Sequence, residues 1–137
     1  MGEFIINGKR WQNNIMNDGV KKLMRILGDI DEEDHRLVKI SVGISSDDGE
    51  NKTLTELVSE IGGKYDITTD DVSVSYPFDL QLGITIPDTE IDRPETIKEV
   101  GVWFGDDVLF ARAVDEDGTT LGVGEAVTIT YSLVVTA

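Results

Sequence analysis

Hydrophobic and polar residues alternate along the segment that leads into an acidic turn in the second half of the chain. Val100, Val102 and Phe104 occupy every second position before the turn at Gly105 to Asp107. A period of two is what a pleated strand with one buried face requires. After the turn the chain is apolar or small at most positions, which is typical of a strand that packs on both faces. The segment from Ile97 to Val114 therefore predicts a β-hairpin around which the other elements are organised.

A second, shorter hairpin is predicted at the N-terminus. Phe4 to Ile6 precedes Asn7 and Gly8, two residues that tolerate the positive φ of a type I′ turn, and Trp11 would lie on the returning strand. We expect residues 1–15 to form a β-ribbon. It is either an arm that docks on a neighbouring subunit or an additional edge of the main sheet.

Alternation also predicts strands at residues 37–44, 72–86 and 127–135. The stretch 72–86 is apolar at every even position, so it is one extended strand or two strands bent at Pro77 or Gly83. Proline cannot donate a hydrogen bond to a neighbouring strand, which favours an edge position or a bulge for this segment.

Two short helices are expected in the N-terminal half. One is capped by Asn17 or Asp18, runs to about Leu27 and ends at Gly28. Its apolar residues at spacings of three and four predict the buried face: Val20, Leu23, Met24 and Leu27. The other helix, residues 54–61, would begin at a capping box formed by Thr53 and Glu56.

These elements predict an α+β fold, a mostly antiparallel β-sheet or sandwich with two short helices in the N-terminal half. A turn around Asp117 and Gly118 would lead from the central hairpin to the last strand. With 137 residues the chain fits one structural domain, residues 16–137, preceded by the ribbon of residues 1–15.

Composition narrows the class of partner. The net charge of −15 opposes binding to nucleic-acid phosphates and to anionic lipid, so we expect neither nucleic acid nor a membrane as a partner. The chain has no cysteine and therefore neither disulfides nor thiolate metal ligands. Its N-terminus lacks the basic and apolar regions of a secretion signal, so we expect synthesis in the cytoplasm.

The sequence predicts no cofactor, no metal site and no enzymatic activity. The acidic run Asp29 to Asp34 resembles a calcium loop only in charge, because Asp34 occupies the position where such a loop needs glycine. His35 is the only histidine and lacks the partners of a zinc site or a catalytic triad.

The acidic turn and its neighbours are the best candidates for a contact surface. Trp103 points away from the face of Val102 and Phe104, so it lies either in a second packed layer or free for a contact. With the acidic turn beside it, Trp103 would also suit a carbohydrate-binding β-sandwich that uses Tyr65 or Tyr76 as further stacking platforms. Together with the ribbon, the candidate interface residues are Phe4, Ile5, Ile6, Trp11, Trp103, Asp106, Asp107 and Arg112.

The hairpin and its surroundings resemble the N-terminal domain of tail-collar fibre proteins of tailed bacteriophages. The similarity rests on Glu99 to Phe104, the acidic turn and Leu109 to Ala113. Upstream, a helix, a strand ending Val42-Gly43-Ile44 and the segment Leu57 to Glu60 follow in the same order, so that the resemblance spans roughly residues 17 to 135.

The resemblance implies a virion structural protein, localised in the particle, that binds other virion proteins and forms homo-oligomers. In fibres this domain anchors the fibre to the tail or baseplate. Fibre proteins continue into a shaft, whereas the present sequence ends at Ala137. This difference favours a tail, collar or baseplate adaptor, or a decoration protein of the capsid or neck, over a receptor-binding fibre.

Overall fold

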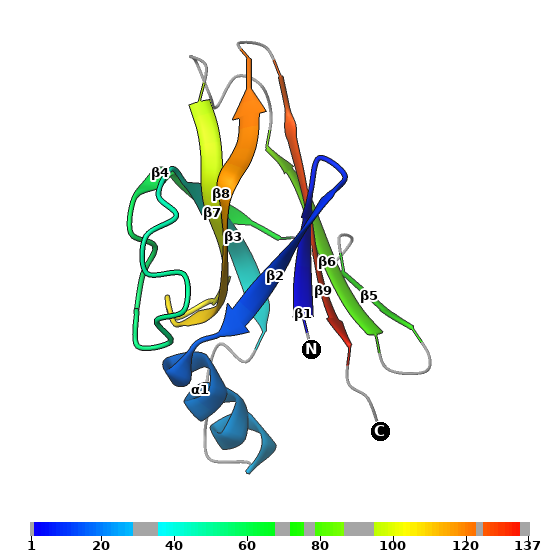
Figure 1. Ribbon diagram of the computed structural model, residues 1–137. Helices are drawn as coiled ribbons and strands as arrows, with labels where there is room; N and C mark the ends of the chain where they lie inside the picture. Colours follow the sequence, from blue (N-terminus) through cyan, green and yellow to red (C-terminus); the bar gives the residue numbers. More distant parts are fainter. Residues whose placement is uncertain are drawn as a thin grey trace.

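The computed structural model describes residues 2–28, 36–67, 72–75, 79–86, 95–122 and 125–134. In these segments one sheet of nine strands runs in the order β4-β3-β7-β8-β2-β1-β9-β6-β5, and one helix, α1, lies below it (Figure 1). The elements are β1 (Gly2–Ile6), β2 (Lys9–Ile15), α1 (Asn17–Leu27), β3 (Leu37–Gly43), β4 (Glu60–Asp66), β5 (Val72–Ser75), β6 (Asp79–Ile86), β7 (Glu95–Phe104), β8 (Leu109–Leu121) and β9 (Val127–Val134).

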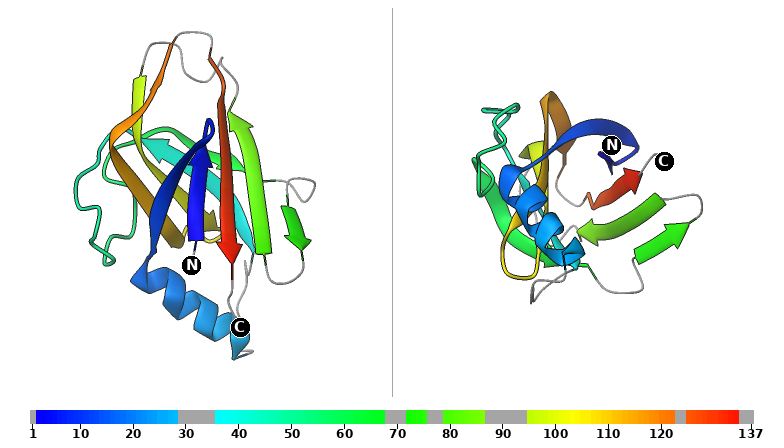
Figure 2. Two further views of the ribbon diagram at one scale, coloured as in Figure 1. Left: turned by 45° about the vertical axis from the view of Figure 1, so that its right-hand side comes forward. Right: turned by 90° about the horizontal axis from the view of Figure 1, so that it is seen from below.

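The sheet curls so that its two halves face each other, and all strand pairs are antiparallel (Figure 2). Strand β2 forms the corner. Its first part, Lys9 to Gln12, pairs with β1, whereas Asn13 to Ile15 pairs with β8. Seen from below, α1 lies across one end of the curled sheet (Figure 2). The prediction of a mostly antiparallel β fold is therefore confirmed.

The predicted central hairpin is confirmed as β7 and β8, which lie between β3 and β2 in the sheet. Asp107 adopts φ 64° in the connecting turn. The predicted turn at Asp117 and Gly118 is wrong, because β8 continues through these residues to Leu121. The pairing with β7 shifts register there, and Gly118 has φ 66°, so a β-bulge accommodates the glycine instead of a reversal.

The N-terminal ribbon is confirmed as a hairpin, with φ 47° at Asn7 and φ 85° at Gly8. It is not an arm. Strand β1 lies between β2 and β9, and the side chains of Phe4 and Ile6 are fully buried in the main core. Its inward residues fill the space between the two halves of the sheet, so the ribbon is part of this fold.

Helix α1 occupies the predicted residues, but its predicted cap and buried face are wrong. Met16 is the N-cap residue, and no side chain caps the first turn. The helix approaches β8 at Gly19, where a β-carbon would lie 2.6 Å from the carbonyl oxygen of Phe110. This close approach turns Lys22 toward the sheet, with Leu23 and Ile26 partly buried beside it. Three of the four residues predicted to be buried are instead exposed: Val20, Met24 and Leu27.

The second predicted helix is absent from the described segment 44–67. Asn51 binds both the backbone amide and the hydroxyl of Thr53 through its side-chain oxygen, which replaces the predicted capping box by a local turn. Strand β4 begins at Glu60, where the last turn of that helix was expected. Its two glycines, Gly62 and Gly63, have positive φ and accompany a register shift against β3.

The long alternating segment forms two strands, β5 and β6, that pair as a hairpin. Gly83 is a regular position within β6, opposite Thr130 of β9. Pro77 lies outside the described residues, as do Asp29 to Asp34 and His35. The predicted strands at residues 37–44 and 127–135 are confirmed as β3 and β9.

Two hydrophobic clusters hold the fold together. The larger one fills the inner side of the curled sheet and includes Phe4, Ile6, Trp11, Ile40, Val100, Val102, Phe104, Phe110, Ile129 and Tyr131. The smaller one lies on the outer side of β7 and β8 and consists of Met16, Leu57, Trp103 and Leu109. The chain between β3 and β4, residues 44–59, covers this outer side (Figure 1). We call residues 44–59 the outer loop.

Candidate functional site

The residues predicted to form an interface are not assembled into one exposed surface. Phe4, Ile6, Trp11, Trp103 and Arg112 are all buried within the chain. Ile5 is partly exposed, and Asp106 and Asp107 are exposed at the β7–β8 turn. The buried five cannot contact a partner unless the domain opens, so the prediction is wrong for these five residues. For Ile5, Asp106 and Asp107 the interface stays a prediction.

Trp103 belongs to a second packed layer, one of the two alternatives that the sequence left open. Its indole N–H donates to the hydroxyl of Ser41 at 2.8 Å, and the ammonium of Lys64 lies 4.3 Å from the ring centroid. Only 2% of the residue is exposed. A sugar therefore has no access to the ring, and the carbohydrate-binding alternative loses its principal stacking platform.

Arg112 forms a buried ion pair with Glu99, a residue on the neighbouring strand β7. The guanidinium lies 3.1 Å from the carboxylate and donates to the carbonyls of Asp47 and Asp48 at 2.9 and 3.1 Å. The other carboxylate oxygen of Glu99 accepts the backbone N–H of Ser59 at 3.1 Å. The pair thus ties both ends of the outer loop to the sheet, which is a structural role.

The acidic turn is engaged by lysines of its own chain. The ammonium of Lys22 lies 2.7 Å from Asp106, and that of Lys39 lies 3.8 Å from Asp107. The Lys22 ammonium also lies 5.4 Å from the ring centroid of Phe104. The contacts of Lys22 hold α1 against the hairpin, and the contact of Lys39 joins β3 to the same turn.

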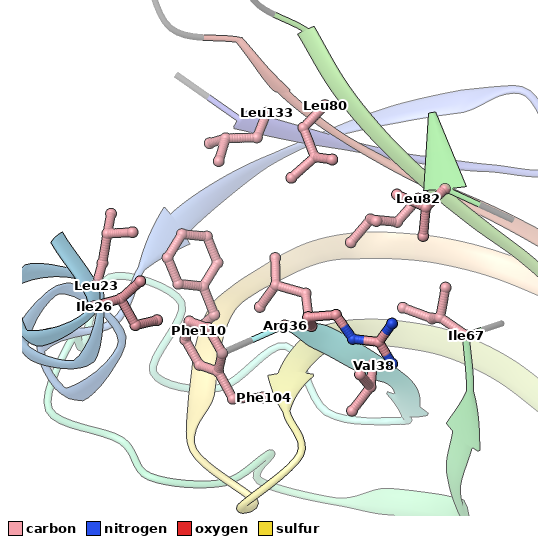
Figure 3. Close-up of a pocket in the computed structure, with 12 residues that line it drawn as sticks. Leu23, Ile26, Arg36, Val38, Ile67, Leu80, Leu82, Phe104, Phe110 and Leu133 are labelled. Atoms are coloured by element: carbon pink, nitrogen blue, oxygen red, sulfur yellow. The ribbon is translucent and has the colours of Figure 1, made fainter. Parts of the chain in front are cut away.

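A pocket of about 400 Å³ opens between α1 and the two halves of the sheet (Figure 3). Its walls come from α1, β3, β5, β6, β7, β8 and β9, and all the lining residues that the structure describes are apolar except Arg36. The lining residues are Leu23, Ile26, Arg36, Leu37, Val38, Ile67, Val72, Leu80, Leu82, Phe104, Phe110 and Leu133. A concave apolar site of this size with one charged group is suited to a small organic ligand.

The outward face of α1 forms an apolar stripe of Val20, Met24 and Leu27. Met24 is 63% exposed and Leu27 is 73% exposed, whereas Leu23 and Ile26 of the same helix face the pocket. Val74 of the edge strand β5 is 77% exposed. Single exposed apolar residues are ordinary, but three in a row on a short helix mark a surface that a partner could cover.

The pKa values of Asp115 and Tyr131 are shifted, and neither shift points to acid–base chemistry. A hydrogen bond from Lys9 lowers the pKa of Asp115, and burial raises the pKa of Tyr131 above its usual value. Among the described residues no group of acidic or histidine side chains is arranged to hold a metal ion. None of the described helical structure is long and apolar enough to span a membrane.

Comparison with known proteins identified no matching family model, no matching curated protein and no matching solved structure.

Sequence reasoning did not find the pocket. Leu80, Leu82 and Leu133 were correctly placed on strand faces by their alternation, but a buried face that is filled and one that lines a cavity have the same pattern. The sequence did not single out Arg36 as a binding residue, since one arginine beside a predicted strand is common on any protein surface.

Proposed function

We propose that this chain is a structural subunit of a bacteriophage particle, an adaptor of the tail, collar or baseplate that acts by protein–protein assembly. The observation that carries the proposal is the apolar stripe of Val20, Met24 and Leu27 on α1. Burying a fully exposed side chain of this kind gains about 1.5 to 3 kcal/mol. These three begin 45%, 63% and 73% exposed, so each would gain a part of that amount. The particle as the setting comes from the resemblance of the hairpin region to tail-collar fibre domains.

The stripe is one part of the interface we propose. A stable contact buries about 800 Å² on each partner, more than one face of an 11-residue helix offers. Leu23 and Ile26 of α1 and Val72 of the edge strand β5 line the same pocket, and Val74 of β5 is exposed. A partner covering this end of the molecule would contact both elements.

Self-association is the first form of assembly to test, because the resemblance implies a homo-oligomer. Light scattering of the purified protein on a size-exclusion column, over a range of concentrations, should give a discrete oligomer. Met24→Glu together with Leu27→Glu should shift the mass to the monomer, since each change puts a carboxylate into an apolar contact.

Val58→Glu is the matched control. Val58 is an exposed valine on the outer loop, so this change adds a carboxylate away from α1 and should leave the oligomer intact. A wild-type monomer at all concentrations would contradict the homo-oligomer. The alternative, a decoration protein of the capsid or neck, then predicts that the monomer binds its particle and that the α1 variant does not.

A further inference from the structure

The pocket between α1 and the two halves of the sheet has the features of a binding site for a small amphiphile. We propose that it binds a monocarboxylic acid with an apolar chain, such as a medium-chain fatty acid, with the chain in the pocket and the carboxylate on Arg36. The proposal concerns the inner side of α1 and does not depend on the assembly role proposed for the outer side.

The volume and the walls favour an apolar ligand chain. At about 400 Å³ the pocket lies within the range of roughly 300 to 1,000 Å³ that is usual for small-molecule sites. Leu80, Leu82 and Leu133 line it from one half of the sheet, and Phe104 and Phe110 line it from the other half (Figure 3). These side chains offer no hydrogen bond, so the buried part of the ligand must be apolar as well.

Arg36 supplies the polar end of the site. It is an exposed residue next to β3, and its guanidinium lies among the apolar lining residues, on the side of the pocket where Ile67 lies (Figure 3). No ion pair or hydrogen bond joins this guanidinium to any part of the chain that the structure describes. It is therefore available to a carboxylate, which it can bind through two parallel hydrogen bonds.

The charge of the whole chain makes this arrangement selective. With a net charge of −15, the protein repels anions over most of its surface. An anionic amphiphile is retained only where a cation adjoins an apolar cavity, and among the described lining residues of this pocket Arg36 is the charged one. A neutral molecule of the same shape fills the cavity but leaves the guanidinium without a partner, so it binds more weakly.

The test is a calorimetric titration with decanoate below its micelle concentration, repeated with decanol. Wild-type protein should bind decanoate at one site, with an affinity at least about tenfold higher than for decanol, as expected of one charge-assisted contact. Arg36→Gln should abolish this preference and leave decanol binding unchanged. Arg10→Gln, which makes the same change of charge on β2, should bind as the wild type does.

A second variant tests the location of the chain. Leu80→Phe enlarges a partly buried side chain that lines the pocket and should weaken both ligands together. Failure of decanoate to bind the wild type in a saturable manner would overturn the proposal, as would equal binding of decanoate and decanol. Binding that is unaffected by Leu80→Phe in a folded variant would place the ligand elsewhere.

Discussion

The buried ion pair between Glu99 and Arg112 provides the sharpest test of how the outer side of the sheet is built. Glu99 is fully buried and Arg112 is 2% exposed, so neither charge can regain water when its partner is removed. Glu99→Gln keeps the shape of the side chain and an oxygen for the Ser59 amide, but leaves the guanidinium with neutral partners only. Removing one member of a buried pair costs about 3 to 5 kcal/mol.

Arg112→Met removes the other partner and should be at least as costly. It leaves a buried carboxylate whose one remaining partner among the described residues is the Ser59 amide, and it frees the carbonyls of Asp47 and Asp48. A domain of this kind has a total stability of about 5 to 15 kcal/mol, so either change takes a large part of it. The double variant should be less destabilised than the sum of the two, by about 1 to 3 kcal/mol, because no lone charge remains.

Urea denaturation followed by tryptophan fluorescence measures these differences, since Trp103 lies beneath the same outer loop. Hydrogen exchange at the amide of Ser59 reports whether the loop detaches before the sheet unfolds. Single variants that each lose less than about 1 kcal/mol, or strict additivity in the double variant, would refute the reasoning, because both results require that the charges are solvated or unpaired.

Two further predictions concern helix packing and pH. Gly19→Ala should destabilise the domain by about 1 to 3 kcal/mol in urea although alanine favours a helix, because its β-carbon would lie 2.6 Å from the carbonyl oxygen of Phe110; a gain in stability would show that α1 is free to move. Burial raises the pKa of Tyr131, so above pH 10 the unfolded chain releases a proton that the folded chain retains, and the free energy of unfolding should fall by up to about 1.4 kcal/mol per pH unit. Tyr131→Phe should make this fall of the unfolding free energy with pH shallower by the contribution of one proton. An unchanged slope would contradict the assignment of the raised pKa to Tyr131.

The strands could be predicted from the sequence because their signal is local. The alternation from Val100 to Phe104 follows from the pleat alone, and the turn at Asn7 and Gly8 follows from the φ values that these two residues tolerate. The existence of a helix at residues 17–27 follows in the same way from spacing. These features depend on neighbours within a few residues, so no knowledge of the rest of the fold is required.

Features that depend on distant contacts were predicted wrongly or missed. The capping box at Thr53 and Glu56 is a valid local signal, but Leu57 gains more by packing against Trp103 than a short helix would provide. The Asp117-Gly118 turn became a bulge, because continued pairing of β8 with β7 buries Leu121 and Ile97. In both cases burial against another element outweighed a local preference.

By itself, the sequence determined that this protein is mostly antiparallel β structure, strongly acidic, with a helix after an N-terminal hairpin. Only the tertiary structure decided that this hairpin joins the two halves of the sheet and that Gly19 turns Met24 and Leu27 outward. It also decided that a pocket stays open beside Arg36. Periodicity states that a face is apolar, but whether that face meets other side chains, a cavity or solvent depends on the distance between elements far apart in the chain.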